Sequence, residues 1–313
     1  MRRKLVLISV AAIAALSFVS CRKDCPSSLP QRQVLSFSSV FDVYSHGSQG
    51  WIKTDTVGIF SISGQQASQN NLAYLPTGTA TYEIKDLKGK KYIMYNSQVT
   101  GEIELKPLFK DKSIVFNEGE NIIYAYTPFN KESSDYKKIS VPDIRVQNQN
   151  PQEFKPFSKY GLYYASAKVT KYSDAPLSLG AFKPCFSQIT LPGVSCPDAL
   201  VGKTCTKIIV KSERPIAYEK GATIDLSTMT ITGKPVRQIE YALSEPLEIV
   251  SGYKGASIGS TSYIMVAVPF DKGLETEFEF VFTIDGKDYS MKAKAHQKMS
   301  KENNLNMYGN SGI

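Results

Sequence analysis

Short apolar runs with a two-residue period recur along this chain, and they constrain its fold more than any other feature. The clearest run is Glu277–Ile284, in which three phenylalanines and the final isoleucine alternate with mostly polar residues. Side chains of a strand point alternately to opposite faces, so this run predicts a strand with one face in the core. The following Asp285-Gly286 predicts a tight turn into a second strand over Lys287–Ala295.

Similar runs are spread over the rest of the chain, whereas helical periodicity is almost absent. They are separated by Gly, Pro, Asn, Asp and Lys. The other predicted strands are Val34–Val40, Thr56–Ser63, Thr81–Ile84, Ser113–Phe116, Asn121–Tyr126, Leu162–Ala167, Thr206–Val210 and Ser262–Val268. Many short strands with frequent turn residues predict an all-β protein of β-sandwich architecture.

The first twenty residues have the layout of a secretion signal. Three basic residues at positions 2 to 4 precede Leu5–Val19, an apolar stretch that is too short for a stable membrane span. Ser20 followed by Cys21 then matches the lipoprotein-processing pattern. We expect cleavage before Cys21, a diacylglycerol on its thiol, and a further acyl chain such as palmitate on its new amine. Phe18 stands where Leu is commoner, so an ordinary cleaved signal with a coincidental cysteine is the alternative.

A lipid on Cys21 predicts a protein anchored in the outer membrane and exposed at the cell surface. Removing the signal leaves 37 − 3 = 34 basic and 29 acidic residues, a net charge of +5. These charges are scattered and no nucleic-acid motif occurs, so we expect no nucleic-acid partner.

The mature chain is long enough for two domains of ordinary size. Residues 21–32 are polar with two prolines and are interpreted as a lipidated tether. The Gln- and Asn-rich segment Ser140–Phe157 reads as a connection, and a second strand-rich block begins by Tyr163. We therefore predict an N-terminal domain over 33–165 and a C-terminal domain over 166–313.

Four cysteines remain besides Cys21, and export to an oxidising compartment favours disulfides between them. Cys196 and Cys205 flank a turn-forming loop and are the predicted pair; closing that loop would stabilise the fold by roughly 2.7 kcal/mol. The pairing of Cys25 and Cys185 is left open. A zinc site is the weaker alternative, because the chain has no Cys-x-x-Cys pair and its two histidines are far away in sequence.

Catalytic constellations are missing from the sequence. Neither His46 nor His296 lies in a His-Glu-x-x-His frame, and no nucleophile elbow, phosphate-binding loop or dinucleotide fingerprint occurs. The stretch Asp285–Asp288 lacks the later glutamate of a calcium loop, which favours a hairpin turn. We therefore predict no catalytic residue, no metal site and no cofactor, and a protein that is not an enzyme; a hydrolase is a distant alternative.

Several stretches, in order and at suitable spacing, resemble the fimbrillin family, the subunits of the lipoprotein-derived pili of Bacteroides-type bacteria. The strongest match is Ser113–Phe129, an apolar strand, a Gly-Glu turn and then Ile-x-Ala-Tyr-x-Pro-Phe. The other matching stretches are Val34–Ser38, Trp51–Phe60, Asn71–Tyr74, Ile139–Gln147, Leu162–Ala165, Thr206–Thr232, Tyr263–Pro269 and Glu277–Ala295. Each piece is a structural strand or turn of low specificity, but together they cover most of the mature chain.

This resemblance implies two β-sandwich domains with transthyretin-like topology. It also implies that other pilus subunits are partners through β-strand exchange, in which a C-terminal strand of one subunit fills a groove in another. An adhesive ligand on a host or bacterial surface is a further implied partner.

One departure from the family pattern concerns maturation. In polymerising members an arginine-directed protease cuts after the first strand, but Gln33–Trp51 contains no Arg and no Lys. Arg32 precedes the strand and Lys53 belongs to the next one. The C-terminal candidate donor, Leu305–Tyr308, is also short. These features favour an anchor or accessory subunit that keeps its first strand.

A surface glycan-binding lipoprotein of a polysaccharide uptake system is the alternative function. Its support is limited to Trp51 and the tyrosines of the Tyr160–Tyr172 segment. Such a platform needs aromatic side chains that are exposed on one face, so their burial separates the two hypotheses.

Overall fold

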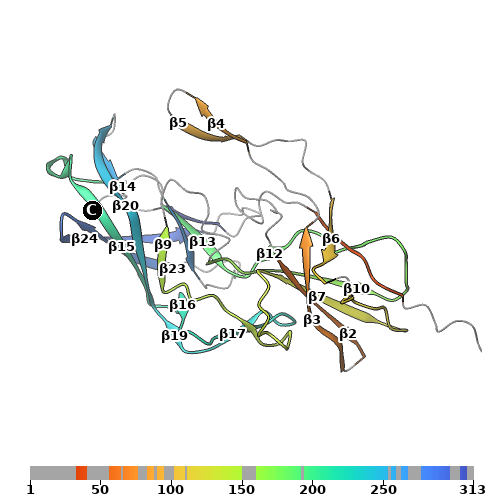
Figure 1. The fold of residues 1–313 in the computed structure, drawn as a ribbon. Helices are drawn as coiled ribbons and strands as arrows, with labels where there is room; N and C mark the ends of the chain where they lie inside the picture. The colour runs from red at the N-terminus through yellow and green to blue at the C-terminus, as the bar shows by residue number, and fades with distance from the viewer. Residues whose placement is uncertain are drawn as a thin grey trace, which may run out of the picture. The chain divides into compact units, whose positions relative to one another are not determined.

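The computed structural model describes residues 33–40, 56–64, 66–76, 83–87, 90–94, 102–109, 111–149, 160–191, 194–252, 255–258, 262–266, 276–296 and 304–308. Over these residues the fold is all-β, as predicted, and is built from curled sheets of the kind found in β-sandwiches (Figure 1). The transthyretin-like connectivity stays a prediction. The predicted signal peptide, the tether and Trp51 lie outside the described residues.

The first large sheet has eight strands. Their order is β11 (Leu177–Ser178), β1 (Phe37–Val40), β6 (Glu102–Pro107), β3 (Gln66–Pro76), β2 (Val57–Ser63), β7 (Asn121–Thr127), β10 (Tyr163–Val169) and β12 (Lys183–Pro184). Most neighbouring strands are antiparallel, but β1 and β11 are parallel.

The second large sheet has ten strands. Nine follow the order β14 (Val194–Ser195), β21 (Gly255–Ile258), β20 (Gln238–Gly252), β15 (Thr204–Ser212), β23 (Thr276–Ile284), β24 (Lys287–His296), β25 (Asn304–Tyr308), β13 (Ser187–Leu191) and β22 (Ser262–Val266). The tenth, β9 (Val146–Gln149), pairs in parallel with β20.

Small sheets complete the described structure. They are β16 (Ala217–Tyr218) with β19 (Pro235–Val236), β18 (Thr230–Thr232) with β17 (Thr223–Asp225) and β8 (Ile139–Ser140), and β4 (Glu83–Leu87) with β5 (Lys90–Met94). A short 3-10 helix, η2 (Asp198–Leu200), lies between β14 and β15 in the chain.

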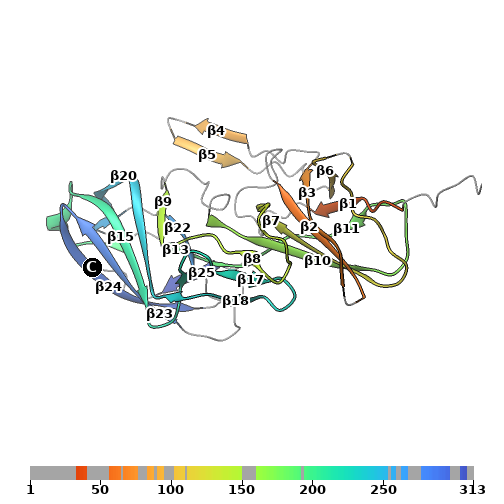
Figure 2. The same cartoon turned by 60° about the horizontal axis from the view of Figure 1, so that its bottom comes forward.

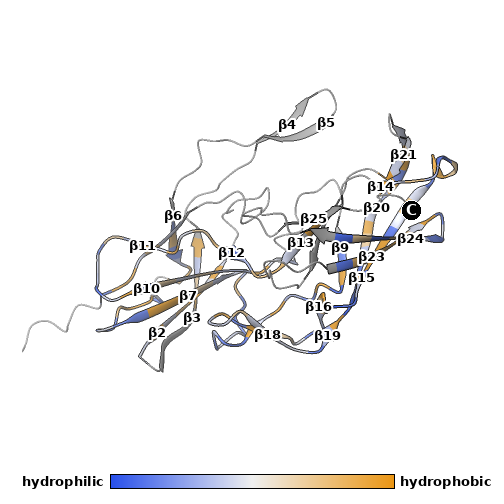
Figure 3. Ribbon diagram, turned by 180° about the vertical axis from the view of Figure 1, so that it is seen from behind, coloured by the Kyte–Doolittle hydropathy of each residue, from blue (hydrophilic) through white to orange (hydrophobic). Residues whose placement is uncertain are grey.

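The predicted hairpin is confirmed as β23 and β24. Phe278, Phe280 and Phe282 are fully buried, and the flanking glutamates are not. Both turn residues have positive φ, 45° at Asp285 and 76° at Gly286. Positive φ at both positions is what a two-residue turn needs to match the twist of its strands. Other strands also mix hydrophobic and hydrophilic positions, as Figure 3 shows for β15 and β20.

Other predicted runs differ in detail from the observed strands. Ser113–Phe116 forms no strand; only Val115 makes a single antiparallel bridge, with Val34. The segment Ser140–Phe157, predicted to be a connection, contributes β9 and the last residue of β8 to sheets, and Gln147 within it is fully buried. That glutamine donates a hydrogen bond from Nε2 to the Ile144 carbonyl (3.1 Å), which satisfies part of a polar group inside the core.

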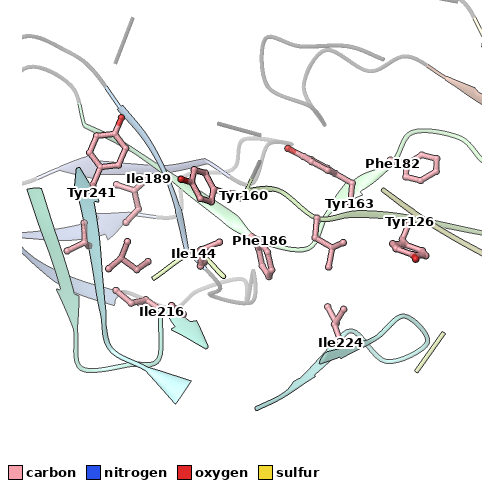
Figure 4. Packing of buried hydrophobic residues seen from close by; sticks show 14 of the residues in the cluster. Tyr126, Ile144, Tyr160, Tyr163, Phe182, Phe186, Ile189, Ile216, Ile224 and Tyr241 are labelled. Atoms are coloured by element: carbon pink, nitrogen blue, oxygen red, sulfur yellow. The ribbon is translucent and has the colours of Figure 1, made fainter. Parts of the chain in front are cut away.

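The predicted division into 33–165 and 166–313 stays a prediction. Strand β10 runs through position 165 and pairs along its whole length with β7. Apolar side chains from both large sheets belong to one buried cluster, which includes Tyr126 of β7 and Tyr241 of β20 (Figure 4).

Candidate functional site

The first strand, β1, lies inside the eight-stranded sheet and not at its edge (Figure 2). On one side it pairs antiparallel with β6, from Phe37↔Leu105 to Val40↔Glu102. On the other side it pairs in parallel with β11, at Phe37↔Leu177 and Ser38↔Ser178. The groove between β6 and β11, which β1 fills, is the candidate functional site.

Side chains of the first strand and the residues before it anchor it in the core. Leu35 is 4% exposed, and Phe37 and Ser39 are not exposed at all. Phe37 contacts the ring of Tyr74 edge to face, with 5.4 Å between the ring centroids. Leu35, Phe37 and Ser39 thus lie on one buried face of the segment, and Ser38 on the opposite face is buried as well.

Hydrogen bonds tie one edge of the same segment to residues 177–180. Backbone N–H groups of Leu177 and Leu179 donate to the carbonyls of Ser36 and Ser38, each at 2.8 Å. The Ser39 hydroxyl donates to the Gly180 carbonyl (3.0 Å). A two-residue strand such as β11 is too short to show an alternating hydrophobic pattern. The sequence therefore did not indicate that residues 177–180 border the groove.

Tyr74 supports the floor of the groove. Its hydroxyl accepts a hydrogen bond from the backbone N–H of Ile114 (2.9 Å). Burial raises the pKa of Tyr74 to about 12, although this hydrogen bond lowers it. The phenol is therefore neutral over the physiological pH range. The hydrogen bond fixes the position of Ile114, and the Ile114 carbonyl in turn accepts a hydrogen bond from the N–H of Leu35 (2.8 Å).

The last described strand, β25, also lies inside a sheet. It pairs antiparallel with β24, at Lys294↔Tyr308 to His296↔Asn306, and in parallel with β13, at Gln188↔Asn304 to Thr190↔Asn306. Both the first and the last described strands thus form sheets with their own chain.

The predicted disulfide residues lie on either side of η2 in the chain. Cys196 follows β14, and its backbone N–H donates to the Ala256 carbonyl (2.8 Å). Cys205 is buried in β15, and both residues carry free thiols. The pKa of Cys205 is raised to about 11, mainly by burial; a hydrogen bond to the Lys207 backbone lowers it and the nearby Cys196 contributes a smaller increase. The Cys196–Cys205 disulfide stays a prediction.

Of the other cysteines, only Cys185 lies within the described residues. Burial raises the pKa of the Cys185 thiol, which is also free in this structure. Cys21, the predicted lipidation residue, and Cys25 lie outside the described residues.

Tyrosines of the Tyr160–Tyr172 segment do not form one exposed platform. Tyr160 and Tyr163 are 5% and 4% exposed and lie among the core side chains in Figure 4. The Tyr160 hydroxyl accepts from the backbone N–H of Asn148 (2.7 Å). Tyr164 and Tyr172 are half-buried, and Tyr172 donates to Asp174 (2.9 Å).

A cluster of stacked rings was not predicted from the sequence. Tyr124 of β7 stacks on Tyr136 with 4.9 Å between centroids and 5° between planes, and Phe60 meets Tyr136 edge to face. The Tyr136 carbonyl accepts from the N–H of Leu226 (3.0 Å). These contacts join the first sheet to the loop after β17, and their role is structural.

Within the described ranges, no group of three or more His, Cys, Asp or Glu side chains is arranged to hold a metal ion. The same ranges contain no helix that is long and apolar enough to cross a membrane.

The family profile of fimbrillin-like proteins matches residues 45–308. A search of curated protein sequences gives no significant match.

Three similar crystal structures are candidate cell adhesion proteins of Bacteroides species. The protein from Bacteroides uniformis has 15% identity and a TM-score of 0.46, covering 83% of this chain and 85% of its own. The protein from Bacteroides ovatus has 12% identity and a TM-score of 0.45, covering 83% and 86%. The protein from Bacteroides fragilis has 9% identity and a TM-score of 0.42, covering 87% and 91%. Because the family profile spans most of the sequence, the chain belongs to the fimbrillin-like family.

Proposed function

We propose that this protein is a cell-surface component of a pilus, with a structural or adhesive role and no catalytic one. We further propose that it is an anchor or accessory subunit, held in the outer membrane by acyl chains on Cys21. Membership of the fimbrillin-like family supports the general role.

The observation that carries the anchor or accessory role is the position of β1. Its backbone pairs on both sides, and Leu35 and Phe37 are buried in the groove. A groove filled in this way accepts no strand from another subunit until β1 is removed, since buried backbone groups need partners. Gln33–Trp51 offers no Arg or Lys at which a basic-specific protease could remove it.

Strand exchange at this groove would be β-augmentation, in which main-chain hydrogen bonds hold the strand and alternate side chains fill pockets. An incoming strand would need to reproduce the buried pattern of Leu35, Phe37 and Ser39. The small third residue matters because the Ser39 hydroxyl is bonded to Gly180 with no exposed surface.

The pairing of β25, the strand that would be donated to another subunit, supports the same proposal. Because β25 pairs with both β24 and β13, donating it to another subunit would first break its pairing within its own sheet. Neither end of the fold is then ready for repeated head-to-tail exchange, which favours a subunit at one place in a fibre over a stalk subunit.

Electron microscopy with antibody to this protein tests the pilus role. We expect label at surface fibres or at their bases in wild-type cells, and loss or detachment of fibres in a strain that lacks the gene. Uniform label over the cell envelope, together with unchanged fibres in the deletion strain, would contradict the role.

Lipidation is tested separately by globomycin, which should make the unprocessed precursor accumulate, and by the mass of the N-terminal peptide. The Cys21→Ala protein should leave the membrane fraction after a high-salt wash. Cys21→Ala protein that resists this wash would contradict the acyl anchor.

The glycan-binding alternative draws no support from Tyr160 and Tyr163, because buried rings cannot stack on a sugar from solvent. Trp51 lies outside the described residues.

A further inference from the structure

Three of the exposed apolar side chains lie near the beginning of the described chain. The large hydrophobic side chains that are exposed in the described residues are Val34, Leu108, Phe109, Val146, Val201 and Val250. Val34 bridges Val115 at the start of the fold, and Leu108 and Phe109 directly follow β6, the antiparallel neighbour of β1. Since Phe37 pairs with Leu105, residues before Phe37 and residues after Leu105 lie toward the same end of this strand pair.

The Leu108-Phe109 turn is held in place and is not a loose loop tip. The backbone N–H of Leu108 donates to the Ala73 carbonyl (2.8 Å), and that of Lys112 donates to the Phe109 carbonyl (2.9 Å). Nevertheless Leu108 is 42% exposed and Phe109 is 54% exposed. Exposed apolar groups that gather on one fixed surface, as Val34, Leu108 and Phe109 do, mark a contact with a partner or a membrane.

Two exposed lysines lie beside these apolar groups, together with the acidic residues Glu104 and Asp111. The Lys112 Nζ lies 5.5 Å from the centre of the Phe109 ring, and the Lys106 side chain is 65% exposed. Lys106 meets one carboxylate, Glu104, at 3.6 Å, where both side chains are well exposed. Surface pairs of this kind hold their partners weakly, so Lys106 remains available to an anion.

We propose that Val34, Lys106, Leu108, Phe109 and Lys112 form a membrane-docking patch. Its partner is the anionic headgroup layer of the membrane that holds the lipidated chain, so the proposal rests on the acyl anchor proposed above. Apolar groups would enter the boundary between headgroups and acyl chains while the lysines contact phosphates.

The length of the chain between the anchor and the patch supports this partner. The chain between the acylated Cys21 and Val34 spans at most about 45 Å when fully extended, so Val34 stays within that reach of the anchor. Docking would hold the first sheet at a fixed orientation on the membrane, whereas the acyl anchor alone would only limit its distance.

Fluorescence quenching of the lipidated full-length protein in vesicles tests the contact directly. F109W and V250W variants each add one tryptophan to the same background from Trp51, at exposed sites in the turn after β6 and in β20. With phospholipids brominated on their acyl chains, we expect quenching of the added signal in F109W and not in V250W. Equal quenching of the two variants, or none in either, would overturn the proposal.

Vesicle binding of the unlipidated C21A protein tests the basic component. Replacing Lys106 and Lys112 by Gln should weaken binding to phosphatidylglycerol-containing vesicles roughly 25-fold, because each lysine near an anionic surface contributes about a factor of five. The matched K131Q/K138Q control, which also removes two exposed lysines, should bind like the C21A parent. Equal losses in both double variants would reject the patch.

Failure of the patch and failure of the anchor give different results. If mass spectrometry finds no lipid on Cys21, the anchor is wrong and the proposal falls with it. If the lipid is present but the F109W signal is not quenched, the patch alone is wrong.

Discussion

At the scale of single residues, Phe37 is the side chain that most directly fixes the first strand. Phe37→Ala should lower the free energy of unfolding by about 3–5 kcal/mol, because a large ring is removed from a closed core site. Phe109→Ala is the matched control: its ring is 54% exposed, so a change within about 0.5 kcal/mol is expected. Urea denaturation of the purified proteins measures both, and similar losses would show that Phe37 does not anchor the strand.

Tyr74 predicts a dependence of stability on alkaline pH. Its pKa rises from 10.0 unfolded to about 12 folded, so the folded state favours the neutral phenol. The contribution of the neutral Tyr74 phenol to the free energy of unfolding is fully present below pH 10 and is lost as the pH rises toward 12. Tyr74→Phe should cost about 1–3 kcal/mol at neutral pH, because the Ile114 N–H loses its acceptor. The variant should then lose less stability than wild type between pH 10 and 12; parallel curves would contradict this assignment.

Cys196 and Cys205 give a prediction about oxidation. In protein isolated from the envelope, non-reducing peptide mapping should find one cross-linked peptide pair that joins these residues. The bond should raise the free energy of unfolding by roughly 2.7 kcal/mol over the reduced form. Free thiols at both positions in freshly isolated protein would reject the disulfide.

At the scale of elements, the β23–β24 hairpin depends on Gly286. Its φ of 76° strains any residue with a side chain, so Gly286→Ala should destabilise the protein by about 1 kcal/mol. Gly252→Ala is the control, because Gly252 does not require a positive φ and an added Cβ would lie an ordinary 3.6 Å from the Gly255 carbonyl oxygen. Thermal denaturation of both variants measures the difference, and equal shifts in Tm would argue against the turn conformation.

Strands with regular alternation could be predicted from the sequence. Glu277–Ile284 is such a strand, because one face is buried and period-two patterning follows directly from that burial. β20 was missed: it runs for 15 residues, contains Pro246 and several acidic residues, and pairs with different partners along its length. Its register is therefore determined by strands distant in sequence.

The groove could be predicted only in part. Val34–Val40 was expected to be the first strand, but its neighbours β6 and β11 come from residues 102–107 and 177–178. The first half of β3, Gln66–Asn71, is polar and shows no alternating hydrophobic pattern that would predict a strand. Pairings over such distances depend on tertiary contacts, which override local propensity.

At the scale of the whole molecule, the first and last described strands are both paired within their own sheets. A polymerising subunit needs one empty groove and one free strand. We therefore expect this chain to remain uncut and membrane-bound in the cell, and to occupy a single position in any fibre that contains it.

The mature N-terminus tests this account most directly. Mass spectrometry of protein from intact cells and from sheared fibres should find an acylated N-terminus at Cys21, with the protein in the membrane fraction. As a matched control, His46→Arg places an arginine after the first strand, and an arginine-specific protease should then cut there and release the protein. A wild-type N-terminus between residues 41 and 55, with the protein in sheared fibres, would contradict the account and make the chain a polymerising pilin.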